Sequence, residues 1–128
     1  MRVLIDTQVV IWLAGGVESQ LTPAAKRCFE EADALFLSVV SYWEIAIRRS
    51  VKKLKWDDRE NDASARGLGE NQIEEIAIRH AHCDKVATLP RHHRDPFDRM
   101  LIAQAQVEDF AILSRDREFA KYDVRVVW

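Results

Sequence analysis

Short apolar segments alternate along this chain with segments of helical periodicity, and this alternation constrains the fold more than any other feature. The β-branched, apolar segments predict strands at residues 2–5, 35–40, 73–78, 110–113 and 124–128. Between them we expect helices at 7–14, from Thr22-Pro23 onward, and at 41–53, 57–69, 80–88, 96–108 and 117–121. Such an order forms a sheet covered by helices on both faces. The sequence therefore predicts a three-layer α/β fold with a central, largely parallel sheet.

The length of 128 residues is sufficient for one domain with its own core. We find no internal repeat, low-complexity tract or Pro/Gly-rich linker, so we expect a single domain over residues 1–128. No stretch approaches the roughly 18 apolar residues of a membrane span, and the first apolar run is too short for a signal peptide. The two cysteines, Cys28 and Cys83, make no disulfide framework. We therefore expect a cytoplasmic protein that is not bound to a membrane.

The charge balance narrows the classes of partner. The chain has 19 Lys and Arg residues against 21 Asp and Glu residues, for a formal net charge of −2. Proteins that bind duplex DNA without sequence preference are usually basic, so that class is disfavoured. An enzyme with a local acidic site and local basic patches agrees with these numbers.

Four acidic residues are predicted to converge at one edge of the sheet. Asp6 ends the first strand, and Asp116 follows the strand at 110–113. Glu44 and Asp98 each lie in the first turn of a predicted helix. In a parallel sheet the carboxyl ends of the strands share one edge, where ligands bind.

Two of these acids occupy positions where an isolated carboxylate is costly. Asp6 ends an apolar strand, and Asp98 falls between Ile102 and Ala105 in the apolar arc of its helix, away from Arg99. Carboxylates about 5 Å apart repel by about 3 kcal/mol per pair at an effective dielectric near 20. The cluster would need a shared proton or a cation. Oxygen ligands suit Mg²⁺ or Mn²⁺ better than zinc, and such an ion can promote phosphodiester hydrolysis.

Each acid also has a purely structural interpretation. Asp6 and Asp116 could cap the helices that follow them. Ser41 and Glu44 fit a capping box, and Asp98 lies where a helix dipole favours any acid.

Four segments that carry these acids resemble the motifs of PIN-domain ribonucleases, especially the VapC-type toxins of bacterial and archaeal toxin–antitoxin pairs. The segments are VLIDTQVVIWL, LSVVSYWEIAIR, LPRHHRDPFDRMLIAQA and ILSRDREFAKY, which together span nearly the whole chain in the family's order. Gln8 departs from the His that often follows Asp-Thr in close relatives, at a position that is not a metal ligand.

The resemblance implies a PIN-like three-layer fold and a metal-dependent endoribonuclease toxin that forms homodimers and is neutralised by a cognate antitoxin. It assigns Mg²⁺ binding, with Mn²⁺ as a substitute, and catalysis to Asp6, Glu44, Asp98 and Asp116. Of the two acids in the third motif, Asp98 is favoured as the metal ligand, and Asp95 would cap its helix and support the ligands. Thr7 and Ser114 would be further polar supports.

Basic residues lie near two of the motifs. Five of the eight residues from 48 to 55 are Lys or Arg. Arg48, Lys52 and Lys53 are candidates for contacts with RNA or with the antitoxin, and so are His93 and Arg94 in the loop just before Asp95. The alternative is a solvated helix face, in which Arg48 pairs with an acid one turn away.

The same residues disfavour several other classes of function. A catalytically silent PIN-like module that binds antitoxin or RNA is the main alternative, and the complete set of acids argues against it. A phosphoacceptor receiver domain would need a pair of acids at the end of the first strand, but Asp6 is followed by Thr7. A phosphatase with an Asp nucleophile would need an Asp-x-Asp motif, and this chain has Asp6-Thr7-Gln8 instead. The spacing of the histidines and cysteines matches no standard zinc finger.

Overall fold

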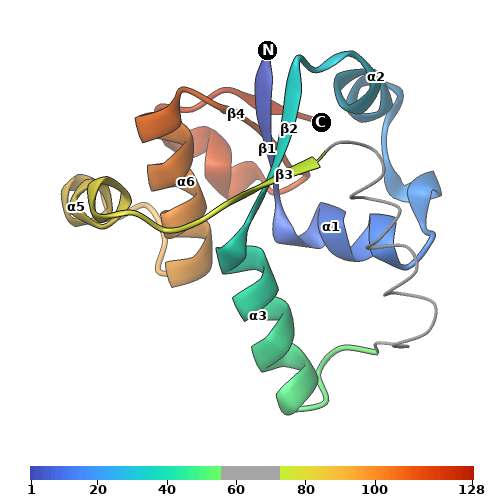
Figure 1. The fold of residues 1–128 in the computed structure, drawn as a ribbon, viewed down its shortest axis with the longest axis horizontal. Helices are drawn as coiled ribbons and strands as arrows, with labels where there is room; N and C mark the ends of the chain where they lie inside the picture. Colours follow the sequence, from blue (N-terminus) through green and yellow to red (C-terminus); the bar gives the residue numbers. More distant parts are fainter. Residues whose placement is uncertain (56–72) are drawn as a thin grey trace.

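The computed structural model describes residues 1–55 and 73–128, which contain a parallel five-stranded sheet in the order β3-β2-β1-β4-β5 (Figure 1). The strands are β1 (Arg2–Ile5), β2 (Ala34–Ser38), β3 (Ile73–Ile76), β4 (Ala111–Leu113) and β5 (Val126–Val127). The helices are α1 (Thr7–Ala14), η1 (Glu18–Gln20), α2 (Pro23–Glu31), α3 (Val39–Ser50), α5 (His80–Thr88), α6 (Pro96–Glu108) and η2 (Arg117–Lys121). The predicted α/β fold with a parallel sheet is confirmed.

Helices cover both faces of the sheet, which gives the three layers. Figure 1 shows α1 and α2 on one side and α5 and α6 on the other. The central strand β1 sends Val3 and Ile5 into the core beneath α1 and α2, and Leu4 into the core beneath α6. All three side chains are at most 1% exposed. A strand buried on both faces reads as a continuous apolar run, which is why Arg2–Ile5 was recognisable.

The junction of β2 and α3 differs from the prediction. The strand expected at 35–40 ends at Ser38, and α3 begins at Val39 rather than at Ser41. The Ser38 hydroxyl caps the helix by accepting the backbone N–H of Val40 at 3.1 Å. Glu44 consequently lies in the second turn of α3 and not in the first. The expected capping box is wrong, since the Ser41 side chain is buried and is not the cap.

Other boundaries are shifted by a few residues. Three strands are shorter in the structure than expected from the sequence, those predicted at 73–78, 110–113 and 124–128. The helix expected at 41–53 ends at Ser50. The helix expected at 57–69 lies outside the described residues. No helix in the described ranges is long and apolar enough to cross a membrane.

Candidate active site

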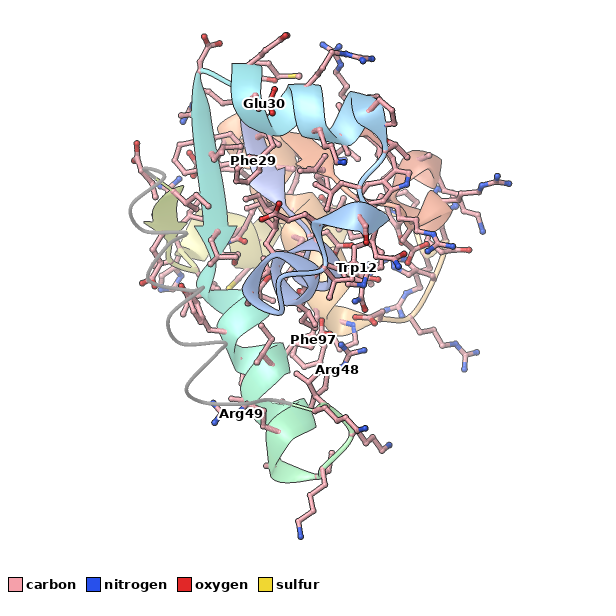
Figure 2. The ribbon with its side chains drawn as sticks, turned by 90° about the vertical axis from the view of Figure 1, so that its right-hand side faces the viewer. Trp12, Phe29, Glu30, Arg48, Arg49 and Phe97 are labelled. Carbon is pink, nitrogen blue, oxygen red and sulfur yellow. The ribbon has the colours of Figure 1, made fainter. Side chains whose placement is uncertain are left out.

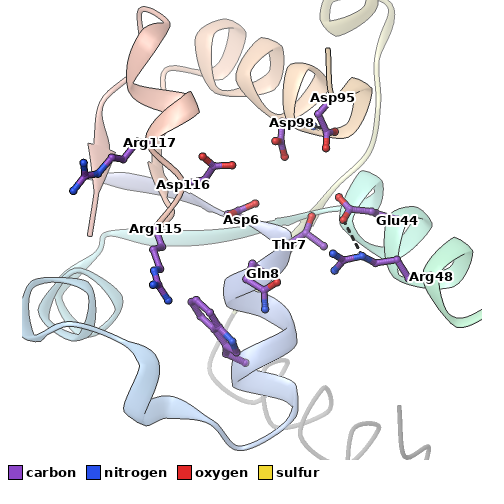
Figure 3. Close-up of a pocket in the computed structure, with 11 residues that line it drawn as sticks. Asp6, Thr7, Gln8, Glu44, Arg48, Asp95, Asp98, Arg115, Asp116 and Arg117 are labelled. Atoms are coloured by element: carbon purple, nitrogen blue, oxygen red, sulfur yellow. Dashed lines mark hydrogen bonds and ion pairs between the residues drawn. The ribbon is translucent and has the colours of Figure 1, made fainter. Parts of the chain in front are cut away.

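An open cleft of about 620 Å³ lies where β1 and β4 end and α1, α3 and α6 begin (Figure 3). Its lining residues are Asp6, Thr7, Gln8, Trp12, Glu44, Arg48, Asp95, Asp98, Arg115, Asp116 and Arg117. The four acids predicted to converge all line this one cleft, although they come from four separate parts of the chain. The carboxyl ends of parallel strands explain the meeting of Asp6 and Asp116.

Asp6 is held in the cleft by a side chain from the neighbouring strand. The residue is 6% exposed, and its Oδ2 accepts a hydrogen bond from the Ser114 hydroxyl at 2.8 Å. Asp6 occupies the position before α1 but makes no side-chain cap there, so the capping interpretation is wrong for this residue. Burial raises the pKa of Asp6 to about 6. The bonds from Ser114 and the Thr7 N–H lower it, and the charges of Glu44 and Asp116 raise it.

Asp98 carries the most perturbed carboxyl group of the cleft. Its side chain is only 15% exposed, which agrees with its predicted place in the apolar arc of α6. The Nε2 atom of His93 lies 3.4 Å from its Oδ2 atom. Burial raises the pKa of Asp98 to about 8, with further increases from Asp95, Asp6, Asp116 and Glu44, in that order. Carboxylates from four elements therefore act on this group.

Glu44 is paired with a cation as well as facing the cleft. Its Oε2 lies 3.7 Å from the Arg48 Nε, one turn along α3, as the structural interpretation of Arg48 predicts (Figure 3). Burial raises the pKa of Glu44; the Arg48 charge lowers it, and the Asp95 charge raises it again. Glu44 thus brings a negative charge to the cleft, and Arg48 on the same helix pairs with that charge.

Two acids have both a capping role and a place in the cleft. Asp116 Oδ1 accepts the Glu118 N–H at 2.9 Å and so begins η2. Asp95 Oδ1 accepts the N–H groups of Phe97 and Asp98 at 2.9 and 3.0 Å and begins α6. Capping therefore does not exclude a role in the cleft, because the side chains at the start of a helix lie at the sheet edge.

Of the predicted supports and basic residues, some reach the cleft and others do not. Thr7 is buried, with its hydroxyl 2.9 Å from the Ser41 hydroxyl. His93 contacts Asp98 but does not line the cleft. Lys52 lines a separate hollow beside the end of α3, and Arg94 lines another one next to Trp43. Lys53 is also absent from the cleft lining.

The carboxylates suit a hard cation chemically but do not form a finished ligand set. Within residues 1–55 and 73–128, no three His, Cys, Asp or Glu side chains are grouped closely enough to hold a metal ion. The charges of Glu44 and Asp116 raise the pKa of Asp6, and the charges of the neighbouring carboxylates likewise raise the pKa of Asp98. An all-oxygen set with excess negative charge fits Mg²⁺ or Mn²⁺. The ion would have to draw the carboxylates closer together.

Sequence reasoning missed four residues of the cleft. Gln8 and Trp12 stand four residues apart on α1 and so share one helix face. Arg115 and Arg117 flank Asp116 in the turn after β4. Their closeness in sequence to Asp6 and Asp116 is the signal that could have identified them.

The fold and the cleft together define an α/β protein with an acidic site at the carboxyl edge of a parallel sheet. A sequence profile of the PIN domain matches residues 3–125, and the chain belongs to this family. A search of curated protein sequences finds no significant match.

Solved structures of similar fold agree with this assignment. The chain resembles one in the crystal structure of VapBC2 from Rickettsia felis bound to a promoter DNA fragment, with 12% identity, 98% and 97% of the two chains covered, and a TM-score of 0.71. It also resembles a chain of DNA-bound VapBC from Salmonella typhimurium, with 13% identity, 98% and 96% covered, and a TM-score of 0.71. It also resembles a chain of a toxin–antitoxin complex from Klebsiella pneumoniae, with 18% identity, 98% and 96% of the two chains covered, and a TM-score of 0.66.

Proposed function

We propose that this protein is a metal-dependent endoribonuclease, the toxin of a VapC-type toxin–antitoxin pair. The observation that supports it most is the convergence of Asp6, Glu44, Asp98 and Asp116 in one open cleft. Membership of the PIN domain family supports a nuclease, and the net charge of −2 argues against duplex DNA as the substrate.

In this proposal Asp6, Asp98 and Asp116 hold one or two Mg²⁺ ions, with Mn²⁺ as a substitute. When bound, the metal supplies positive charge that neutralises the carboxylates and the phosphate and makes water a better nucleophile. Glu44 orients the attacking water, and its raised pKa favours its acting as a proton acceptor. Water adds to phosphorus and the bond to the 3′ oxygen breaks, which leaves 5′-phosphate and 3′-hydroxyl ends.

Thr7, Ser114 and Asp95 position these carboxylates through hydrogen bonds. Ser114 donates to Asp6 at 2.8 Å, the Thr7 hydroxyl lies beside Glu44 and lowers its pKa, and Asp95 fixes the first turn of α6 below Asp98. Arg48 in the cleft lining would contact RNA or the antitoxin, and so would four basic residues outside that lining, Lys52, Lys53, His93 and Arg94.

The partners follow from the similar structures. Several of these are toxin–antitoxin complexes, so we infer a cognate antitoxin that covers this chain and silences it. We further infer a homodimer of single-domain chains, residues 1–128, that acts in the cytoplasm.

A catalytically silent module is the second candidate, because the described residues contain no finished metal-ligand set. Purified protein free of antitoxin, incubated with total RNA in Mg²⁺, in Mn²⁺ and in EDTA, separates the two. We expect cleavage in either metal, none in EDTA, and none with Asp98→Asn. The control Asp84→Asn changes an exposed acid on α5 that does not line the cleft, and it should cleave normally.

Cleavage retained by Asp98→Asn would refute the assignment of the site. Absence of cleavage, together with no Mn²⁺ binding in a calorimetric titration, would favour the silent module.

A further inference from the structure

The cleft extends beyond its carboxylates to a cation that the proposed reaction does not use. Arg115 lines the cleft and is exposed. In Figure 3, Arg115 and Gln8 lie on the opposite side of Asp6 from Asp95 and Asp98. Within the described ranges the Arg115 guanidinium makes no hydrogen bond or ion pair, whereas Arg48 is paired with Glu44. Arg115 is therefore an available cation at the far end of the cleft from the acids of α6.

An aromatic ring also lines the cleft. Trp12 is half-buried, lines the cleft and extends from α1, on the side of the molecule that faces the viewer in Figure 2. Its ring centroid lies 5.7 Å from that of Trp128, with the planes tilted by 41°. Contact with the Trp128 ring restricts rotation of the indole, which reduces the conformational entropy lost when it stacks on a ligand.

These side chains match the parts of a nucleotide. A guanidinium binds phosphate through two parallel hydrogen bonds, an indole stacks on any base, and the Gln8 amide offers both a donor and an acceptor to a base edge. In a duplex the bases are paired and stacked on each other, so they cannot reach a side chain in a cleft. Only an unpaired nucleotide could occupy all three contacts.

We propose that Trp12, Gln8 and Arg115 form a binding subsite for one unpaired nucleotide beside the phosphate that is cut. This inference rests on the proposed ribonuclease function. Trp12 receives the base, Gln8 contacts its edge, and Arg115 binds the neighbouring phosphate.

Binding measurements test the subsite apart from cleavage. A fluorescent 12-nucleotide RNA and its duplex are titrated, without divalent ions, with the Asp98→Asn protein at several KCl concentrations. We expect tighter binding of the single strand. Adding Arg115→Gln should lower the slope of log affinity against log salt by about 0.7, the value for one lost phosphate contact on a single strand. Adding Arg27→Gln, an exposed arginine on α2 outside the cleft, should not change the slope.

The tryptophan is tested with two substitutions, because its ring also packs against the core. Trp12→Phe keeps an aromatic ring and should retain most of the affinity, while Trp12→Leu should lower it about 5- to 150-fold, the range for one lost stack. Equal binding of the single strand and the duplex, or an unchanged salt slope in Arg115→Gln, would overturn the subsite.

The two proposals fail in different ways. If wild-type protein cuts RNA and Trp12→Leu and Arg115→Gln, made in the wild-type protein, cut it equally well, the ribonuclease stands and the subsite is refuted. If no protein cuts RNA but single-strand binding depends on both residues, the subsite stands and the ribonuclease is refuted.

Discussion

At the scale of single residues, Ser114 links two acids of the cleft to each other. Its hydroxyl donates to Asp6 Oδ2 at 2.8 Å and accepts the backbone N–H of Asp116 at 3.0 Å. The side chain is 1% exposed, so no water replaces either bond. Ser114 thereby fixes the Asp6 carboxylate relative to the turn that carries Asp116.

We expect Ser114→Ala to weaken Mn²⁺ binding about 10- to 100-fold, as the loss of a hydrogen bond behind a metal ligand typically does. It should also cost about 1 kcal/mol of unfolding free energy. Isothermal calorimetry and urea unfolding measure the two effects. Ser50→Ala, at an exposed serine at the end of α3, is the matched control. Equal Mn²⁺ affinity in Ser114→Ala and wild type would contradict this role.

At this scale the sequence predicted which acids meet but not how each is held. Asp6 and Asp116 both precede helices, yet only Asp116 caps one. The pattern could not separate them, because an acid at a helix start looks the same whether its side chain turns to the helix or to the cleft. Trp12 and Arg115 were missed because their place in the cleft depends on how α1 and the turn after β4 lie in space.

At the scale of elements, one guanidinium fastens the end of α5 to the start of α6. Arg99 donates to the carbonyl oxygens of Pro90 at 2.8 Å and Leu89 at 3.3 Å, and to the Tyr122 hydroxyl at 3.2 Å. The sequence places Arg99 outside the apolar arc of α6; in the structure its guanidinium is turned to the end of α5, where it donates to the carbonyl oxygens of Val86 and Leu89. The loop held in this way leads into Asp95 and the first turn of α6.

Arg99→Met should lower the unfolding free energy by about 1 to 3 kcal/mol, because several oxygens lose their donor at once. Arg99→Lys should restore only part of this, since an ammonium cannot reproduce the planar fork of a guanidinium. Arg91→Met, at an exposed arginine in the same loop, serves as the control in urea unfolding. Full stability in Arg99→Lys would show that charge alone suffices.

Element boundaries were the least predictable part of the fold. The β-branched side chains of Val39 and Val40 predict a strand, but the hydroxyl of Ser38 caps a helix that begins there. The strand expected at 73–78 stops at Ile76 because its last partner is Ser38, where β2 ends. The length of a strand in a sheet is limited by the strand that pairs with it. The residues of one strand do not show which strand that is or where it ends.

At the scale of the whole molecule, the sheet concentrates negative charge in one place. The chain has a net charge of only −2, yet the charges of four other carboxylates in the cleft lining act on Asp98. The alternation of strands and helices predicted this edge from the sequence. The alternation could not predict the strand order β3-β2-β1-β4-β5, since which strands become neighbours depends on the direction in which each connecting helix crosses the sheet.

Without metal, stability should fall as the pH rises. In the folded protein the pKa values of Asp6 and Asp98 are about 6 and about 8, whereas an unfolded aspartate titrates near ~3.9. Between about pH 4 and pH 8 the folded state therefore holds more protons, so each added pH unit lowers the unfolding free energy, by at most about 1.4 kcal/mol per titrating group.

Melting temperatures measured in EDTA from pH 5 to pH 9 check this expectation. The temperature should decrease across the range, and Asp98→Asn should remove most of the decrease above pH 6. Saturating Mg²⁺ should also flatten the curve, because a bound cation replaces the protons. A curve in EDTA that is flat over the whole range would contradict the raised pKa values.

The central strand β1 pairs with β2 on one side and with β4 on the other, and this arrangement has a consequence for synthesis on the ribosome. The cleft draws on residues from Asp6 to Arg117, and Asp6 gains its hydrogen bond from Ser114 only when β4 is in place. A nascent chain that has not yet reached β4 therefore has no assembled site. If the proposed activity is correct, the nascent toxin cannot cleave the RNA of the ribosome that is synthesising it.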